Sequence, residues 1–221
     1  MSNYVLIACE YSGVVRDAFA RRGWNAWSCD LLPTQSPGNH FEGNLLERLD
    51  GHTMGPDYNG ETKVPWDLII AHPPCTYLSS SGMHWTTRGL RDIQLTYDAV
   101  EFVKKIVNAN ARHIAIENPI GILSTYLRKP DQIIQPYNFG DDASKRTCLW
   151  LKGLPKLVNT QYIEPRMVNG KARWSNQTDS GQNKLTPSSH RALDRAKTYK
   201  GIAEAMSDQW TRFIQDNVAG L

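Results

Sequence analysis

A cysteine and a glutamate occupy matching positions in this chain. Cys75 follows two prolines that end the apolar run 68–71. Glu117 follows the apolar run 114–116 and stands before an Asn-Pro pair. Short apolar runs bounded in this way predict buried strands, and proline stops a strand because it cannot donate to the ladder. We therefore expect the thiol and the carboxyl at the carboxyl ends of two parallel strands, where open α/β sheets bind their ligands.

The pairing of these two groups indicates a particular chemistry. A thiol on a stiff turn is a candidate nucleophile, although a lone cysteine is more often an inert, buried thiol. A cysteine hydrolase would need histidine beside the thiol. A carboxyl group instead suits addition of the Cys75 thiolate to an electron-poor ring, while Glu117 hydrogen-bonds a ring nitrogen. The alternative for Glu117 is an ion-paired carboxylate at a sheet end. His72 and His84 are further candidates, as proton carriers, but loop histidines more often face solvent.

The first 30 residues predict a strand, a helix and a second strand. Residues 4–8 form an apolar run, and Val14, Val15, Ala18 and Phe19 follow at helical spacing. Gly13 lies at the junction, where backbone amides could face an anionic group, although most such junctions bind nothing. The second strand, residues 25–29, ends at Asp30. A carboxylate at this place accepts from ribose hydroxyls in nucleotide-binding folds; a simple helix or turn cap is the alternative.

The remaining elements extend this alternation into a parallel sheet with right-handed crossovers, so the expected fold class is α/β. Residues 91–108 predict an amphipathic helix, and residues 148–151 a strand. The other expectations are loops around a short helix at 45–49, a mobile active-site loop at 79–89, a long polar loop at 156–190 and a helix over 191–217.

Composition indicates an ordinary soluble globular protein. The 221 residues are 40% hydrophobic and 21% charged, which suits one domain. No apolar run reaches membrane-spanning length and no signal-peptide pattern is present, so we expect a cytoplasmic protein without a membrane partner. The four cysteines and six histidines lack metal-ligand spacing, so we expect no metal site.

The charge is unevenly distributed along the chain. Residues 1–120 hold 10 basic and 13 acidic side chains, a net charge of −3. Residues 121–221 hold 15 and 9, a net charge of +6. This asymmetry is compatible with a polyanionic partner held from one side, and equally with a solvated surface whose asymmetry arose by chance.

With these motifs in place, the chain resembles the cytosine-C5 DNA methyltransferases. That family has a proline–cysteine motif at the end of its fourth strand and a glutamate–asparagine motif at the next strand. Here the counterparts are PPC at 73–75 and ENP at 117–119, in the same order and at a similar separation. KRTCLWLKG at 145–153 is similar to the family's basic motif. The likeness is greatest to small methylase-like proteins of phages and prophages.

Further motifs resemble the family's cofactor-binding parts. ACEYSG at 8–13 stands where the family has a Phe-x-Gly-x-Gly loop, and Asp30 matches its ribose-binding acid. GNLLE at 43–47 resembles the third motif, with Asn44 where an aspartate commonly faces adenine. TYKGIAEAM at 198–206 resembles the last motif, which closes the cofactor pocket. The resemblance extends over about residues 4–213.

The resemblance implies a Rossmann-like, mostly parallel sheet of the S-adenosylmethionine-dependent methyltransferase type. It implies S-adenosylmethionine as cofactor and DNA as partner. Cys75 would attack C6 of cytosine, Glu117 would hydrogen-bond N3 and the exocyclic amine, and Arg146 would hold the base carbonyl oxygen. The implied cofactor contacts are Cys9, Glu10, Tyr11, Ser12, Gly13, Asp30, Leu31, Asn44, Pro73 and Ala203.

The chain also departs from the family's pattern. Its first motif lacks a glycine and has Glu10 nearby, ENP replaces ENV, and the basic motif is not Gln-x-Arg-x-Arg. The family's large target-recognition domain is absent, and only residues 156–190 stand in its place. Low sequence specificity, a single-stranded target and a partner subunit all stay open. So do the same chemistry on a free pyrimidine nucleotide and a non-catalytic protein that binds S-adenosylmethionine or nucleic acid.

Overall fold

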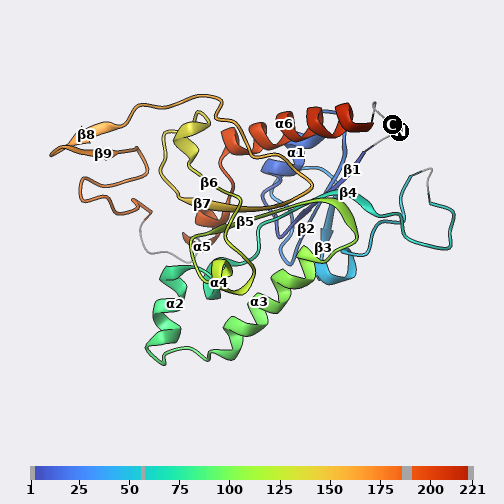
Figure 1. Ribbon diagram of the computed structural model, residues 1–221, viewed down its shortest axis with the longest axis horizontal. Helices are drawn as coiled ribbons and strands as arrows, with labels where there is room; N and C mark the ends of the chain where they lie inside the picture. Colours follow the sequence, from blue (N-terminus) through green and yellow to red (C-terminus); the bar gives the residue numbers. More distant parts are fainter. Residues whose placement is uncertain (1–2, 56–57, 186–190, 219–221) are drawn as a thin grey trace.

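A seven-stranded sheet forms the centre of the molecule, with strand order β3-β2-β1-β4-β5-β7-β6. The computed structural model describes residues 3–55, 58–185 and 191–218 (Figure 1). The sheet strands are β1 (Tyr4–Ala8), β2 (Asn25–Asp30), β3 (His40–Glu42), β4 (Trp66–Ala71), β5 (Ala111–Pro119), β6 (Gln132–Ile134) and β7 (Thr147–Lys152). Strand β7 runs antiparallel to both of its neighbours, and the pairings among β1 to β5 are parallel.

Helices cover both faces of the sheet. They are α1 (Val14–Ala20), α2 (Ser80–Thr87), α3 (Gln94–Val107), α4 (Leu123–Tyr126), α5 (Arg191–Ala196) and α6 (Lys200–Val218). Three short 3-10 turns are η1 (Leu45–Glu47), η2 (Cys75–Tyr77) and η3 (Pro136–Asn138). Helices α1 and α6 lie on one side of the sheet and α3 on the other (Figure 1). The expected α/β fold class with a mostly parallel sheet is confirmed.

The apolar runs of β1 and β4 are buried on both faces, which explains their continuous hydrophobicity. Ile7 belongs to the core under α1 and α6, together with Met206 and Trp210 of α6. Its neighbour Leu6 points to the other face and belongs to the core that includes Val103 of α3. Alternation along one strand therefore supplies two cores and fixes the strand ends where the candidate side chains lie.

Several expectations about the elements need correction. The segment 79–89 is not a mobile loop: it contains α2, whose start is capped by the Ser79 hydroxyl accepting from the Gly82 amide. The predicted helix over 191–217 is two helices, α5 and α6. Strand β5 continues through Pro119, because β7 pairs with its last three residues.

The segment 156–190 was expected to be a long polar loop, but up to residue 185 it contains regular structure. It contains the antiparallel hairpin of β8 (Arg166–Val168) and β9 (Lys171–Arg173), which projects from the body of the molecule (Figure 1). Residues 186–190 lie outside the described part. No helix among the described residues has the length and apolar character needed to cross a membrane.

Candidate functional site

Cys75 lies on a fixed turn at the carboxyl end of β4. Residues 72–74 lead out of the strand, and Cys75 begins η2. Its carbonyl oxygen accepts from the amides of Leu78 at 3.1 Å and Ser79 at 2.9 Å. The cysteine is exposed to solvent. A thiol on a turn held by two backbone bonds is accessible to a substrate, as a nucleophile must be.

The Pro-Pro-Cys turn is joined directly to the end of β5. Ala71 pairs with Ile116 in the parallel register, which brings the residues that follow each strand side by side. The side-chain amide of Asn118 donates to the carbonyl oxygen of Pro73 at 2.8 Å, and Asn118 is buried. The two motifs that sequence analysis singled out therefore meet at one edge of the sheet.

Glu117 is buried at this edge among polar partners. Its Oε2 atom lies 3.6 Å from Nδ1 of His72, and the two side chains are 9% and 6% exposed. Burial alone would raise the pKa of Glu117, but the charge of Lys145, the contact with His72 and a hydrogen bond from Thr147 outweigh it and lower the pKa below 4.5. The free site thus favours a carboxylate at position 117.

Lys145 is the basic side chain that acts most strongly on Glu117. The residue expected for a base contact, Arg146, is exposed, and its charge acts on Cys148. Burial and Glu117 raise the pKa of the Cys148 thiol, while Arg146 opposes them. Sequence reasoning identified the basic motif at 145–153, which contains Lys145 and Thr147, but it assigned the base contact to Arg146 and gave these two residues no role.

In the loop after β1, the carboxylate of Glu10 binds the first amides of α1. Glu10 is 5% exposed, and its carboxylate accepts from the amides of Val15 at 2.7 Å and Arg16 at 3.1 Å. The Ser12 hydroxyl donates to the same carboxylate at 3.2 Å. Because the Glu10 carboxylate occupies the amides of Val15 and Arg16, the structure favours the alternative in which this junction binds no external anionic group through them.

Gly13 is required by the geometry of this loop. Its φ of 77° lies in the left-handed region, and a Cβ there would come within 2.6 Å of the Arg16 guanidinium. Arg16 is itself buried and donates to the carbonyl oxygens of Ser36 and Pro37. This arginine, which sequence reasoning missed, holds the loop that follows Asp30.

Asp30, Leu31 and Asn44 lie together at the ends of β2 and β3. The Gly43 amide donates to the Asp30 carbonyl oxygen at 2.8 Å, which brings Asn44 close to Asp30. The Asp30 carboxyl is half-buried and accepts from the Leu32 amide through Oδ1, and burial raises its pKa above 3.8. Leu31 is 77% exposed. A half-buried carboxylate beside an exposed apolar side chain suits a ribose with an attached base.

Cys9, Tyr11 and Ala203 occupy three different environments. Cys9 has a φ of 58°, and burial with Asp30 nearby raises the pKa of its thiol well above the ordinary value. Tyr11 is buried, and its hydroxyl donates to the Leu193 carbonyl oxygen at 2.8 Å. Ala203 is 1% exposed and belongs to the core between α6 and the sheet. Ala203 is therefore a packing residue in this arrangement and not part of an open crevice.

Residues 193–198, here called the α5 strap, cross the carboxyl edge of the sheet. Tyr11 donates to the carbonyl of Leu193, and Lys145 donates through Nζ to the carbonyl of Arg195 at 3.0 Å. The Thr198 hydroxyl lies 3.4 Å from Nδ1 of His72. The strap thus contacts residues that follow β1 and β4 and precede β7, and it connects the loop at 9–13 with the surroundings of Glu117.

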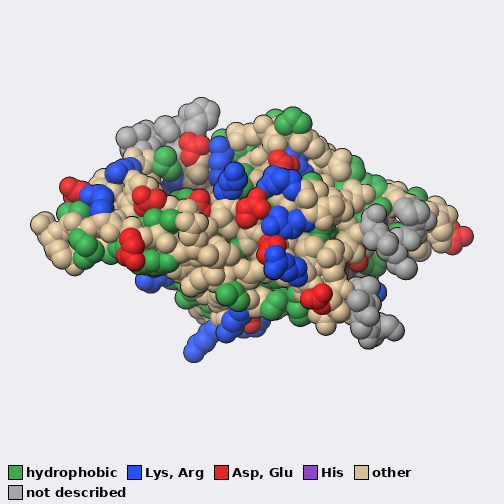
Figure 2. Space-filling view, turned by 90° about the horizontal axis from the view of Figure 1, so that it is seen from above, with side chains coloured by type: hydrophobic (Ala, Val, Ile, Leu, Met, Phe, Trp, Pro, Cys, Tyr) green, Lys and Arg blue, Asp and Glu red, His purple; other side chains and the backbone are tan. Residues whose placement is uncertain are grey.

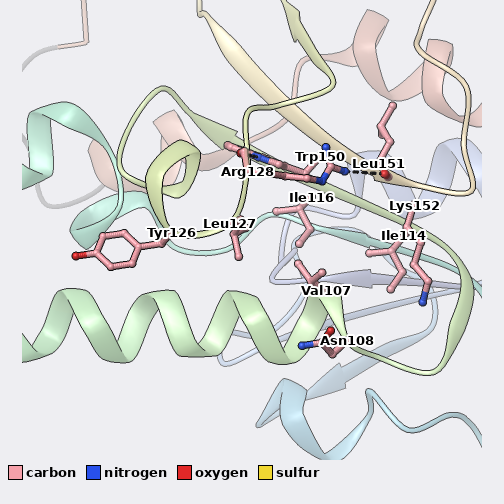
Figure 3. A pocket seen from close by; sticks show the side chains of 10 residues that line it. All are labelled: Val107, Asn108, Ile114, Ile116, Tyr126, Leu127, Arg128, Trp150, Leu151 and Lys152. Atoms are coloured by element: carbon pink, nitrogen blue, oxygen red, sulfur yellow. Dashed lines mark hydrogen bonds between the residues drawn. The ribbon is translucent and has the colours of Figure 1, made fainter.

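Two cavities lie beside, rather than at, this edge. One, of about 280 Å³, is formed between α3, β5, β7 and the end of α4, and Ile116 and Trp150 line it (Figure 3). The other, of about 480 Å³, is open and lies between α2 and the segment after β5, with the exposed His84 in its wall. Neither cavity is lined by Cys75, Glu117 or Asp30. The described residues contain no cluster of His, Cys, Asp and Glu that could hold a metal ion.

Comparisons with known proteins give little further information. No protein-family model matches the sequence, and no curated protein matches it either. One solved structure with a similar fold is that of a candidate DNA modification methyltransferase encoded within a prophage of E. coli. It is 15% identical, with a TM-score of 0.41 over 68% of this chain. The match spans only 46% of that protein's chain.

Proposed function

We propose that this chain transfers a methyl group from S-adenosylmethionine to carbon 5 of a cytosine in DNA, through a covalent bond between the Cys75 sulfur and carbon 6 of the base. The main support is the hydrogen bond from Asn118 to Pro73. It links the turn that carries an exposed thiol to the strand end that carries a buried, partnered carboxyl. That combination suits addition to a flat, electron-poor ring.

The proposed reaction has three stages: addition of the thiolate, transfer of the methyl group and elimination of the thiolate. The Cys75 thiolate would bond to C6, the C5=C6 electrons would form a C4=C5 bond, and the N3=C4 electrons would move to N3, which takes a proton through Glu117. The C4=C5 electrons would then bond C5 to the methyl group as its bond to the sulfonium breaks, and the N3 electron pair would re-form the N3=C4 bond. N3 returns its proton, a base removes the C5 proton, and the C5=C6 bond re-forms as the thiolate leaves. Groups aimed at the developing charge, as Glu117 would be, supply a large part of such catalysis.

The cofactor S-adenosylmethionine supplies an electrophilic methyl group when bound. Its adenosine half fits the ends of β2 and β3, because Asp30 offers a carboxylate oxygen, Leu31 an exposed apolar surface and Asn44 a nearby amide. The remaining contacts implied by the resemblance would come from the loop at 9–13 and from Pro73. In that loop Glu10 acts as a cap for α1, so we assign it a structural part in the cofactor site.

The β8–β9 hairpin is the best candidate for contact with DNA. A two-stranded antiparallel ribbon can enter the major groove. Asn169 and Gly170 at its tip have φ of 48° and 73°, as a tight hairpin turn requires. The basic residues of the hairpin and its base are Arg166, which pairs with Asp179, and Lys171, Arg173 and Lys184, which have no ion-pair partner among the described residues. Trp174 stacks on Tyr137 with 4.1 Å between ring centroids and fixes the base of the hairpin to the body.

The surface formed by α1 and α6 is a second candidate for contact with DNA, but it is less suitable for a polyanion. Arg21 and Arg22 pair with Glu204, and Arg212 pairs with Asp208. Basic and acidic side chains are interspersed over this face (Figure 2). Paired charges of both signs give little net field, so this surface would attract DNA weakly.

The test is mass spectrometry of nucleosides from cells that express the chain and from cells that express Cys75→Ala. We expect 5-methylcytosine in DNA with the first and none with the second. Cys148→Ala, which removes another thiol near Glu117, serves as a fold control measured by circular dichroism. Methylated mononucleotide without methylated polymer would favour a free pyrimidine nucleotide as substrate. Binding of S-adenosylmethionine with no product in either pool would favour a non-catalytic protein.

A further inference from the structure

His72 has a position that the proposed reaction does not yet explain. It follows β4 immediately, and its backbone amide donates to the Ala8 carbonyl oxygen at 2.9 Å. Its side chain is 6% exposed, with Nδ1 turned to Glu117 at 3.6 Å and to Thr198 at 3.4 Å. Its Nε2 atom is buried and has no hydrogen-bond partner among the described residues. A histidine this enclosed is unlike the solvent-facing loop residue that the sequence favours.

Several polar and titratable side chains surround the His72–Glu117 pair. Lys145 and Thr147 approach Glu117 from β7 and the residues before it, and the Cys148 thiol faces it from the same strand. Thr198 of the α5 strap faces His72. Of the side-chain types in this cluster, histidine is the one that ordinarily gives and takes back a proton near neutral pH.

The proposed reaction makes a demand that Glu117 alone meets poorly. N3 of cytosine must receive a proton as the Cys75 sulfur bonds to C6. Lys145 and His72 favour the ionised form of Glu117, which has no proton to give. A neighbour that can carry a proton and lies within ion-pair distance of the carboxylate, as His72 does, would remove this difficulty.

We propose that His72 and Glu117 share one proton, so that His72 is a positioning residue that supplies the Glu117 carboxyl with the proton delivered to N3. The use of this proton in catalysis rests on the proposed function, whereas the sharing of the proton by the two side chains does not. As the C6–S bond forms, the shared proton passes from the His72 imidazolium through the Glu117 carboxyl to N3, which leaves His72 neutral and Glu117 ionised. When N3 is deprotonated after methyl transfer, the proton returns by the same route. The unpartnered Nε2 leaves the ring a second polar atom for water or a bound base.

The direct test is an NMR titration of the six histidine rings in the full chain, with His72 assigned by comparison with His72→Asn. In the wild type, the His72 ring should hold its proton to higher pH than in Glu117→Gln. We expect a fall of about one pH unit in the midpoint in the variant, a tenfold loss of proton affinity. An unchanged midpoint would overturn the inference, whatever the enzyme does.

The reciprocal measurement covers the case in which Glu117→Gln does not fold. In His72→Asn, the titration of the Glu117 carboxyl should move to higher pH, because two coupled groups must affect each other equally. A carboxyl that titrates as in the wild type would contradict proton sharing. His113→Gln, at the other end of β5, is the matched control and should leave both titrations unchanged.

Methylation assays then test whether the proton shared by His72 and Glu117 is used in the reaction. With His72→Asn we expect kcat to fall by about 10- to 100-fold with KM nearly unchanged, and the pH–rate profile to lose its limb near neutrality. A proportional loss at every pH would indicate a purely structural part for His72 and would overturn the inference. Absence of methylation by the wild type would remove the proposed function and leave the two titrations to decide on proton sharing.

Discussion

The Asn118 side chain donates a 2.8 Å hydrogen bond to the carbonyl oxygen of Pro73, and Asn118 is buried. Through this bond the end of β5 holds the turn that leads to Cys75. The bond crosses 45 residues of sequence, so it constrains two segments that are otherwise connected by α2 and α3. A buried amide in this place both stabilises the fold and fixes the geometry of the site.

Substitution Asn118→Ala should therefore affect stability and chemistry together. Loss of the bond leaves the Pro73 carbonyl without its donor, at a cost of about 1–3 kcal/mol. For a chain of this length, each kcal/mol corresponds to a fall in Tm of roughly 2–4 °C. Thermal unfolding by circular dichroism measures the effect, with the exposed Asn110→Ala as control. Equal Tm values for the two variants would show that the bond contributes nothing.

Glu10 should prove to be a structural residue. Glu10→Ala removes the acceptor of two buried amides, those of Val15 and Arg16, at about 1–3 kcal/mol for each. Glu10→Gln keeps one acceptor oxygen and should lose less. Urea unfolding of both variants, with the exposed Glu42→Ala beside them, measures this order. If both variants were as stable as the wild type, capping of α1 by Glu10 would contribute nothing to stability.

Cofactor affinity should depend on pH through Asp30. Burial raises the pKa of Asp30 above 3.8, and only the ionised carboxylate accepts from both ribose hydroxyls. The affinity for S-adenosylmethionine should therefore be highest above this pKa and fall as the pH drops through it. Asp30→Asn should weaken binding at neutral pH by about tenfold or more, equal to about 1.4 kcal/mol, and flatten the pH dependence.

Isothermal titration calorimetry at several pH values measures this dependence. Asp98→Asn on the exposed side of α3 is the matched control and should bind as the wild type does. Equal affinity of Asp30→Asn and wild type at neutral pH would remove Asp30 from the cofactor site.

The hairpin should contribute to DNA affinity through its charges. Lys171 and Lys184 are exposed, and neither has an ion-pair partner among the described residues. Each contact with a phosphate releases a counterion, so Lys171→Gln and Lys184→Gln should each reduce the slope of log affinity against log salt by about 1. Fluorescence anisotropy over a range of salt concentrations measures the slope, with Lys105→Gln on α3 as control. The same slope in all four proteins would exclude the hairpin as the contact.

The strands that carry the candidate site could be predicted because their signals are local. Residues 4–8 and 68–71 are continuous apolar runs, and central parallel strands are buried on both faces. The strands β3 and β6 have three residues each, too few for any periodicity, and only pairing with a neighbour defines them. Helix α2 was missed because its start depends on the Ser79 cap and not on an apolar pattern.

The site itself could be predicted as far as the two motifs, but not their surroundings. Sequence order identifies Cys75 and Glu117 as ends of neighbouring strands. The contact of Glu117 with His72 and the influence of Lys145 arise from pairing with β7 and from the α5 strap, which are long-range. The Glu10 cap was missed because a carboxylate that binds its own helix has no signature distinct from one that faces a ligand.

The central claim is that the Cys75 sulfur bonds to carbon 6 of cytosine. Its most direct test uses DNA with 5-fluorocytosine, S-adenosylmethionine and intact mass spectrometry. Fluorine cannot leave C5 as a proton does, so the adduct should persist. Its mass should equal protein plus DNA plus one CH2 unit, because the adduct gains a methyl group and loses the thiol proton. Peptide mapping should locate the bond at Cys75, and Cys75→Ala should give none. If the wild type methylated cytosine DNA but formed no adduct with the fluorinated DNA, or formed it at another cysteine, the account would be contradicted.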